Sequence, residues 1–200
     1  MEKIERLLKE DFETPDLTDA RDRLVREADR RGLLDVAYAG VDSPMGPLLV
    51  AATRRGLVRV SYNAAERTDQ VLDDLATKLS PRIIEDASRL DEIRRELDEY
   101  FDRKRTRFDM PLDWSMTHGF TRKVLRATAR VPYGELVTYK HVARQAGNER
   151  ASRAAGNALG SNPIPIVVPC HRVVHSGGGL GGYTGGLERK KFLLGVEGAY

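Results

Sequence analysis

Residues 162–174 read Asn-Pro-Ile-Pro-Ile-Val-Val-Pro-Cys-His-Arg-Val-Val and hold Cys170, the single cysteine in 200 residues. Three prolines within seven residues exclude a regular helix, and the apolar residues among them favour burial. We therefore expect Cys170 to lie at the end of a rigid, buried segment. If the chain performs thiol chemistry, it does so at this position.

A reactive Cys170 needs help from its surroundings. A neutral thiol with a pKa of about 8.5 is a poor nucleophile at neutral pH, so a base or a positive charge must lie nearby. His171 and Arg172 are the local candidates. Adjacent side chains rarely point the same way, so we expect a water molecule to bridge the thiol and the imidazole. The alternative is a buried cysteine that acts only as a small hydrophobic residue.

The glycine-rich stretch that follows favours a binding site. Residues 177–186 read Gly-Gly-Gly-Leu-Gly-Gly-Tyr-Thr-Gly-Gly, with seven glycines in ten positions. Such a loop allows its backbone to approach a ligand closely. A flexible linker would share this composition, but Leu180, Tyr183 and Thr184 are unusual residues for a linker.

The composition bears on where the protein is located and on whether it binds a membrane, a cofactor or a metal. No apolar run approaches the roughly 18 residues that a membrane span needs, and the N-terminus lacks the apolar core of a signal peptide. One cysteine permits no internal disulfide and fits a reducing compartment. We expect a cytoplasmic protein with no membrane partner and no cofactor. No metal site is expected either, because the histidines show no metal-ligand spacing; they are His118, His141, His171 and His175.

Charge is distributed unevenly along the chain. Residues 118–200 carry 12 Lys and Arg against 4 Asp and Glu, whereas residues 1–117 carry 21 against 26. The formal net charge of +3 therefore combines +8 in the C-terminal part with −5 in the N-terminal part. The C-terminal part is the one with an electrostatic reason to bind a polyanion.

Residues 1–33 are dense in charge, with apolar residues at helical spacing. We predict two helices separated near Thr14-Pro15, the second capped by Asp16 or Thr18 and stopped at Gly32. The segment is interpreted as a charged helical N-terminal extension packed on the domain. The alternative is a dedicated partner-binding arm.

Residues 34–107 predict a small α/β domain. Three apolar runs separated by turn-like segments indicate an antiparallel meander, with strands at 36–39, 47–52 and 57–62. Helices are expected at 65–79 and 90–101, and Ile83-Ile84 is a candidate short strand. A linker is expected at 108–118, which contains Pro111 and shows no clear period.

Residues 119–200 predict a mainly helical domain that begins with a helix near its first residue. Thr138 can cap a helix over 139–146. Asn148 can cap a second helix that reaches about Leu159, because Gly147 breaks the first. Two short helices joined by a tight turn that contains glycine are typical of a helix-turn-helix.

The second of these helices carries mostly small residues, so one of its faces can lie close to another surface. Arg150 and Arg153 could supply contacts to phosphates or bases. The charge of the C-terminal part favours a DNA-binding helix. The alternative is a closely packed internal helix.

Three motifs together resemble the O6-alkylguanine-DNA alkyltransferases, also called methylated-DNA–protein-cysteine methyltransferases. They are the Pro-Cys-His-Arg-Val run at 169–173, Asn162-Pro163 upstream of it, and Gly-Gly-Tyr-Thr-Gly-Gly-Leu at 181–187. The resemblance extends from about Phe120 to Ala199. It implies an α+β fold, in which a small N-terminal α/β domain with an antiparallel sheet precedes a mainly helical C-terminal domain with a helix-turn-helix.

The resemblance also implies a function in DNA repair. The expected partner is double-stranded DNA that contains O6-alkylguanine, with O4-alkylthymine as a further candidate substrate. The base is flipped out of the stack and its alkyl group is transferred irreversibly to the protein's own cysteine, once per molecule. The protein is expected to be a monomer in solution, with cooperativity on DNA left open. Some members carry a zinc site in the N-terminal domain, but residues 1–117 contain no cysteine or histidine.

Roles carry over from the family by position. The residues of the reaction itself would be Cys170, His171, Glu197 and Tyr139. The residues that contact DNA would be Ala151, Ser152, Arg153 and Tyr139, with Arg153 as the arginine finger that replaces the extruded base. The residues that line the substrate pocket would be Val173, Leu180, Tyr183 and Thr184, and Asn162 would be a structural hinge.

Two other functions compete with this interpretation. A non-catalytic sensor of alkylated DNA would use the same pocket, but such proteins replace the cysteine that is present here. A Cys-His hydrolase would turn over repeatedly, and it needs an oxyanion hole and a histidine aimed directly at sulfur.

Overall fold

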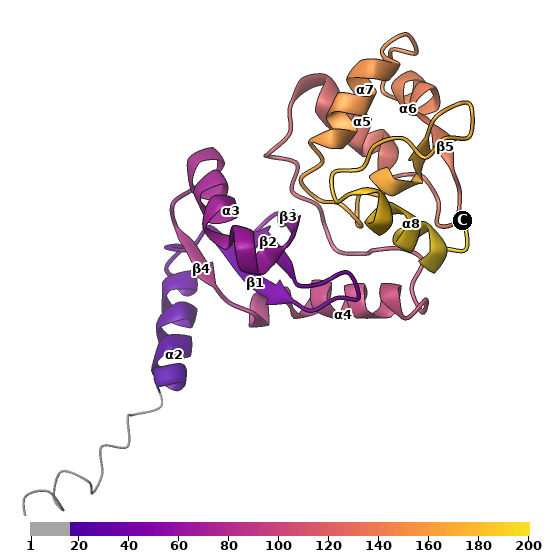
Figure 1. The fold of residues 1–200 in the computed structure, drawn as a ribbon. Coiled ribbons are helices and arrows are strands. Elements are labelled where there is room, and N and C mark those ends of the chain that lie inside the picture. The colour runs from indigo at the N-terminus through magenta and orange to yellow at the C-terminus, as the bar shows by residue number, and fades with distance from the viewer. Residues whose placement is uncertain (1–16) are drawn as a thin grey trace, which may run out of the picture. The chain divides into compact units, whose positions relative to one another are not determined.

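The computed structural model describes residues 17–200, and Figure 1 shows their fold. The described chain divides into two units, the first ending at Leu34 and the second spanning Asp35–Tyr200. The first unit contains helix α2 (Leu17–Arg30), which ends as expected just before Gly32, a residue with a φ of +69°. The predicted cap at Thr18 is wrong, because the helix already begins at Leu17. The other predicted cap, Asp16, and the predicted helix before Thr14-Pro15 lie outside the described residues.

The second unit begins with a four-stranded sheet in the order β3-β2-β1-β4. Strands β1 (Val36–Val41), β2 (Leu48–Thr53) and β3 (Gly56–Tyr62) form the expected antiparallel meander. The short strand β4 (Ile83–Glu85) pairs with β1 in parallel. A parallel partner requires a crossover, and the chain between β3 and β4 supplies it.

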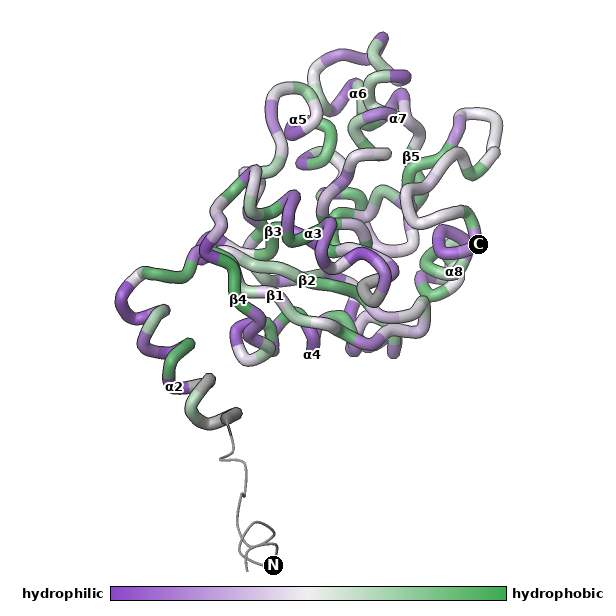
Figure 2. Tube along the Cα trace, turned by 60° about the vertical axis from the view of Figure 1, so that its left-hand side comes forward, coloured by the Kyte–Doolittle hydropathy of each residue, from purple (hydrophilic) through white to green (hydrophobic). Residues whose placement is uncertain are grey.

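Helices cover both faces of this sheet. Helix α3 (Ala64–Lys78) packs Val71 and Leu75 with one set of strand residues. The turn η1 (Ser88–Leu90) and helix α4 (Asp91–Phe101) pack with the alternate set. Figure 2 shows the strands of the sheet mostly in green and pale green. The alternation of strand residues between two cores explains why both faces of β2 are apolar.

The segment expected as a linker lies against the start of β3. The amide of Leu57 donates to the carbonyl of Pro111 at 2.9 Å, and the amide of Asp113 donates to the carbonyl of Leu57 at 2.8 Å. Gly56 permits this approach, since a Cβ atom there would overlap the Pro111 carbonyl. The chain is therefore fixed to the sheet edge before it enters the helical part.

The C-terminal part is mainly helical, as expected. Its elements are α5 (Gly119–Thr128), β5 (Val137–Thr138), α6 (Tyr139–Gln145), α7 (Ser152–Gly160), η2 (Cys170–Arg172), β6 (Val173–Val174) and α8 (Leu187–Val196). Strands β5 and β6 pair in parallel, with Val137 opposite Val173 and Thr138 opposite Val174. This pairing brings the start of α6 next to the chain that follows Cys170.

Helices α6 and α7 form the predicted helical pair. The hydroxyl of Thr138 accepts a hydrogen bond from the amide of His141 at 3.1 Å, so Thr138 caps α6 as predicted. The predicted cap at Asn148 is wrong, because α7 begins at Ser152, four residues later. Asn148 instead forms a turn, in which its side chain accepts from the amide of Arg150 at 3.2 Å.

One hydrophobic core extends from the sheet into the helical part. It joins Val50 and Leu57 of the sheet to Ile93 and Leu97 of α4, and it continues to Val124 and other buried residues of the C-terminal helices. The expected α+β architecture is confirmed. Among the described residues, no helix is long and apolar enough to cross a membrane.

Candidate active site

Asn162 organises the segment that leads to Cys170. Its side-chain amide nitrogen donates to the carbonyl of Val168 at 2.8 Å and to the sulfur of Cys170 at 3.2 Å. Its amide oxygen accepts from the backbone of Ile164 at 3.0 Å. The segment bends at Ile166, whose φ of +74° is unusual for a β-branched residue. One buried side chain therefore fixes both the turn and the thiol.

The thiol of Cys170 is held in its neutral form. The residue is 5% exposed, and burial raises its pKa to about 11, although the hydrogen bond from Asn162 and the charge of Lys190 act in the opposite direction. A thiol in this state is a weak nucleophile until a base removes its proton. The chemistry of Cys170 therefore depends on its neighbours.

His171 lies behind the thiol and is paired with Glu197. Its Nε2 atom is 2.8 Å from Oε1 of Glu197, and the whole side chain is buried. Burial lowers the pKa of His171, and the opposing effect of Glu197 does not compensate for it. A neutral imidazole beside an ionised carboxylate must carry its proton on Nε2. Its Nδ1 atom, which has no hydrogen-bond partner among residues 17–200, then keeps a free lone pair.

Glu197 is the centre of a buried polar network. Oε1 accepts from His171, from the hydroxyl of Tyr100 at 2.7 Å and from Nη2 of Arg172 at 2.9 Å. Oε2 accepts from Nε of Arg172 at 2.8 Å and from the amide of Gly134 at 3.2 Å. Burial alone would raise the pKa of Glu197, but the bonds from His171 and Arg172 hold it well below its usual range. The carboxylate is ionised and fully occupied.

The cation that acts on the thiol is Lys190, not Arg172. The sequence suggested Arg172 because it is adjacent to His171, but its guanidinium is committed to Glu197. Lys190 of α8 is fully buried, and its Nζ donates to the carbonyl of Val173 at 2.6 Å and to that of Leu180. Burial lowers the pKa of Lys190 to about 8. Lys190 therefore carries its charge at neutral pH and holds the backbone on both sides of the turn between Val173 and Leu180.

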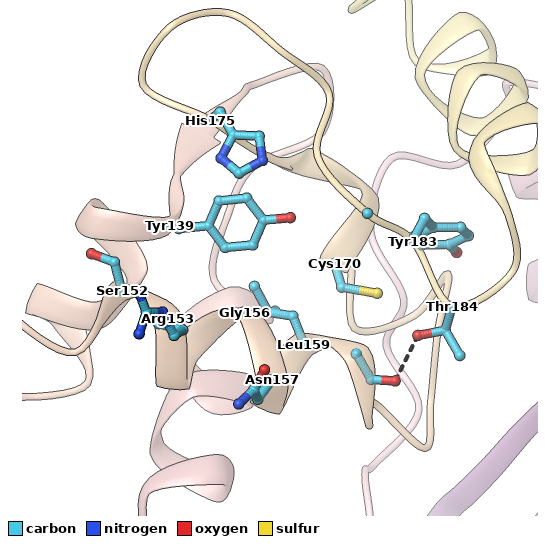
Figure 3. A pocket seen from close by; sticks show the side chains of 12 residues that line it. Tyr139, Ser152, Arg153, Gly156, Asn157, Leu159, Cys170, His175, Tyr183 and Thr184 are labelled. Carbon is cyan, nitrogen blue, oxygen red and sulfur yellow. Dashed lines mark hydrogen bonds between the residues drawn. The ribbon is translucent and has the colours of Figure 1, made fainter.

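Cys170 opens into a cavity of about 650 Å³ between α6, α7 and the glycine-rich loop (Figure 3). In Figure 3, Tyr139 lies between His175 on one side and Ser152 and Arg153 of α7 on the other. The rings of Tyr139 and His175 have centroids 5.1 Å apart. Gly181 lies against the Tyr139 hydroxyl, since a Cβ atom there would be 2.5 Å from it. The tyrosine is thus confined within the pocket.

The glycine-rich loop is anchored at both sides of the pocket. The hydroxyls of Tyr183 and Tyr62 are 2.6 Å apart, which links the loop to strand β3. The hydroxyl of Thr184 donates to the carbonyl of Gly160 at 2.8 Å, the bond drawn in Figure 3. Gly185 permits this arrangement, because a Cβ atom there would be 2.6 Å from the Tyr62 ring. This loop is not a flexible linker in the described structure.

Most of the predicted site residues converge, but not all reach the cavity surface. The predicted residues that line the cavity are Cys170, Tyr139, Ser152, Arg153, Tyr183 and Thr184. His171 and Glu197 lie behind the thiol, and Val173 is fully buried. Leu180 contributes its carbonyl to Lys190 and does not line the cavity, and Ala151 precedes α7.

Four contributors were missed by sequence reasoning: Tyr62, Tyr100, His175 and Lys190. The first two are far from Cys170 along the chain and reach the site only through the tertiary fold. Lys190 follows a glutamate and an arginine and resembles a surface lysine. Its signal was the helical spacing with Leu193 and Leu194, both fully buried, which places Lys190 on the inner face of α8. His175 lies five residues beyond the cysteine and carried no such signal.

Among residues 17–200, no group of His, Cys, Asp and Glu side chains is arranged to hold a metal ion. The cavity is instead lined by one thiol, aromatic rings, hydroxyls and one arginine. These groups can position a planar aromatic ligand and transfer protons. Among them, the sulfur of Cys170 becomes a strong nucleophile once its proton is removed.

Comparisons with known proteins find relatives of both parts of the chain. The family described as 6-O-methylguanine DNA methyltransferase, ribonuclease-like domain, matches residues 36–114. Its companion, the 6-O-methylguanine DNA methyltransferase DNA binding domain, matches residues 119–199. The methylated-DNA–protein-cysteine methyltransferase of Methanosarcina acetivorans is 39% identical over 162 residues, covering 81% of this chain and 98% of that protein. The Mycobacterium tuberculosis H37Rv protein of the same name is 38% identical, with coverage of 81% and 92%.

Solved structures show the same relationship. The crystal structure of the M. tuberculosis O6-methylguanine methyltransferase has a TM-score of 0.65 at 36% identity, covering 81% of this chain and 92% of that one. The structure of M. tuberculosis OGT in complex with DNA has a TM-score of 0.63 at 35% identity, with coverage of 80% and 92%. The chain belongs to the methylated-DNA–protein-cysteine methyltransferase family.

Proposed function

We propose that this protein repairs duplex DNA by moving the alkyl group of O6-alkylguanine irreversibly to the sulfur of Cys170. The observation that carries the proposal is the environment of that sulfur. The single cysteine of the chain faces a cavity of about 650 Å³ at the helical pair, with a buried His171–Glu197 pair behind it.

The substrate base must leave the stack to reach this cavity. O6 of guanine lies inside the duplex, so a buried nucleophile requires a flipped nucleotide. Helix α7 supports this step, because its exposed Arg153 lies at the cavity and its neighbours are small. Arg153 fills the space that the flipped base leaves, and α7 enters the minor groove. Such contacts carry little sequence information, as repair of lesions at any site requires.

The reaction begins with the thiol proton. Neutral His171 accepts it through a bridging water, because its Nδ1 lone pair is free and adjacent side chains diverge. Glu197 stabilises the imidazolium that forms. The sulfur of Cys170 then attacks the alkyl carbon, so that an S–C bond forms while the C–O6 bond breaks. The electron pair of the broken bond stays on O6 of the guanine.

Tyr139 supplies the proton that the departing guanine needs. Burial raises the pKa of Tyr139, so its hydroxyl remains protonated and can donate to N3 of the base. After release of the guanine, the proton held by His171 returns through water to Tyr139, so both side chains regain their starting protonation states. The carbonyl of Cys170 accepts the exocyclic amine, and the backbone of Tyr183 and Thr184 faces O6. The carbonyl of Val173, which the resemblance gives the same role, is buried and bonded to Lys190.

The product is an S-alkyl thioether, which is not hydrolysed under mild conditions. The chain has no second cysteine to receive the group from Cys170. Each molecule therefore acts once. The arrangement does not favour a Cys-His hydrolase, because Nε2 of His171 faces Glu197 and the thiol is bonded to Asn162.

A comparison of two substrates tests the role of Arg153. Arg153→Ala should slow transfer from O6-methylguanine in duplex DNA by about tenfold or more, because the flipped state loses its support. Transfer from free O6-benzylguanine should stay within about twofold, since no base has to be flipped. Equal losses on both substrates would refute the arginine-finger assignment. No transfer from either substrate by the unmodified protein would refute the proposed function itself.

A further inference from the structure

A second cavity lies beside the substrate pocket and has no part in the proposed reaction. Its volume is about 520 Å³, and it is lined by residues of β3, α3, the C-terminal end of α7 and the start of α8. The two cavities share Gly160 and Thr184, so they are neighbours on the protein. We call this second cavity the α3 groove.

The α3 groove is strongly basic. Its ionisable lining consists of Arg59, Arg67, Lys78 and Arg189 against the single carboxylate of Asp74. Three of the four cations belong to residues 1–117, which carry 21 Lys and Arg against 26 Asp and Glu. A basic groove within an acidic half of the chain is a local feature and does not follow from the overall charge.

Two of these cations are satisfied by the protein. Arg189 donates to the side chain of Asn63 at 2.6 Å and to the carbonyl of Gly185 at 3.0 Å. Lys78 pairs with Asp74 at 2.6 Å. These residues are parts of the groove wall and are not free to bind a ligand.

Arg59 and Arg67 are left without adequate partners. The Nε atom of Arg59 is buried and has no hydrogen-bond partner among residues 17–200, and its Nη1 reaches the shared Asp74 only at 3.4 Å. Arg59 and Arg67 line the same groove, and burial lowers the pKa of Arg59. Arg67 is exposed and forms no hydrogen bond or ion pair with any described residue.

A buried unpaired donor and a neighbouring free guanidinium are suited to an oxyanion. Guanidinium groups bind phosphate with two parallel hydrogen bonds, and a phosphodiester would relieve the repulsion between the two arginines. The α3 groove begins at Gly160, the last residue of the helix that we assign to the minor groove. A DNA strand that leaves this end of α7 would therefore meet the groove.

We propose that the α3 groove binds the phosphate backbone of the duplex through Arg59 and Arg67. The DNA would then be held by the N-terminal sheet domain as well as by the helix-turn-helix. This inference rests on the proposed function, because it assumes that the ligand of the C-terminal part is DNA.

The test is the salt dependence of binding to undamaged duplex DNA, measured by fluorescence anisotropy. Arg67→Gln should weaken binding about threefold or more and reduce the slope of log K against log salt by about one, the value for one lost phosphate contact. Arg67→Lys should keep most of the slope. The control is Arg94→Gln, which removes the same charge from an exposed residue of α4, and α4 covers the opposite face of the sheet. It should leave the slope unchanged.

Equal effects of Arg67→Gln and Arg94→Gln would overturn the proposal, because a general loss of charge would then explain both. The rate of transfer from free O6-benzylguanine is measured in parallel. It should be the same for the unmodified protein, for both glutamine variants and for Arg67→Lys. If the unmodified protein does not react with the free base, the proposed function fails, whereas the binding measurement still decides whether the α3 groove contacts DNA.

Discussion

The sulfur of Cys170 must act as a nucleophile, but its burial keeps the thiol protonated and therefore weakly nucleophilic. A thiol with a pKa of about 11 is ionised in only about one molecule in ten thousand at pH 7. A permanent thiolate is therefore not the nucleophile at neutral pH. Neutral His171, with its free Nδ1 atom, is the group that can remove the proton during the reaction.

This arrangement predicts the pH dependence of transfer from free O6-benzylguanine. Between the pKa of His171, which lies below 6.5, and that of the thiol, the fraction of the thiolate–imidazolium pair does not change with pH. The rate should therefore be flat from about pH 6.5 to 7.5. It should fall in more acidic solution, where His171 is already protonated, and above about pH 8, where Lys190 loses its charge. A tenfold rise per pH unit across this range would mean that the thiolate forms without His171.

A second prediction for a single residue concerns the buried charge of Lys190. Lys190→Met removes a buried positive charge near the thiol, so the single-turnover rate at pH 7 should fall about tenfold, the effect of one pKa unit on Cys170. The loss should be smaller at pH 9, because Lys190 itself has a pKa of about 8 and is then mostly neutral. The control is Lys191→Met, on an exposed neighbour that pairs with Glu188. Similar losses in both variants would argue against a specific role for Lys190.

Helices α6 and α7 and the glycine-rich loop position the site through close backbone packing. Tyr139 is the first residue of α6, and the small residues of α7 and the loop leave room for its ring. Gly156 would place a Cβ atom 3.7 Å from the ring, and Gly181 would place one at 2.5 Å from the hydroxyl. Gly181 also has a φ of +71°, which other residues adopt at a cost.

Gly181→Ala should therefore displace the Tyr139 hydroxyl. We expect transfer to slow about tenfold and the free energy of unfolding to fall by about 1 kcal/mol from backbone strain. Single-turnover kinetics and urea denaturation measure the two effects. Gly177→Ala is the matched control in the same loop, because no atom lies within 4 Å of a Cβ there. If the two alanine variants behaved alike, Tyr139 would not be positioned by Gly181.

The sequence predicted these elements well where local chemistry decides them. Apolar runs separated by turn-like segments identified β1 to β3, and Thr138 identified the start of α6. The predicted start of α7 at Asn148 was wrong, because this side chain can cap either a helix or a turn and only the tertiary packing selects between them. The parallel pairing of β4 with β1 depends on the long connection through α3 and has no local signal.

At the scale of the whole molecule, Tyr62 and Tyr183 link the N-terminal sheet domain to the C-terminal helical domain. Tyr62 belongs to β3, and its hydroxyl meets that of Tyr183 in the pocket loop at 2.6 Å. Arg189 of α8 lies over the Tyr62 ring at 4.8 Å and bonds to Asn63 beside it. The N-terminal sheet therefore supports the wall of the substrate pocket, although it contributes no residue to the proposed chemistry.

Tyr62→Phe should leave the hydroxyl of Tyr183 without its partner. The free energy of unfolding should fall by about 1–2 kcal/mol, the cost of an unsatisfied polar group in the interior. The double variant Tyr62→Phe/Tyr183→Phe should recover part of this loss, because both partners are then apolar. Purely additive losses in the double variant, measured by urea denaturation, would contradict a direct bond between the hydroxyls.

The candidate site was predictable only in part, because local motifs reveal some of its residues and tertiary contacts bring in the others. Cys170, His171, Asn162 and Tyr183 lie in one region of the chain with recognisable motifs, and the structure brings them together. Tyr62 and Tyr100 belong to elements whose sequence is explained by core packing alone. Their contribution exists only because the shared core brings the sheet domain against the loop and α8. No sequence pattern near Cys170 indicates that the sheet domain contacts the loop and α8.

The most direct test of the central claim is peptide mass spectrometry after mixing equal amounts of the protein and a duplex that contains one O6-methylguanine. We predict a single added methyl group on Cys170, with loss of the lesion in equal amount and no further turnover. Binding of the duplex without transfer of a methyl group would contradict the account and would indicate a sensor of alkylated DNA. Repeated turnover with an unmodified Cys170 would contradict it as well.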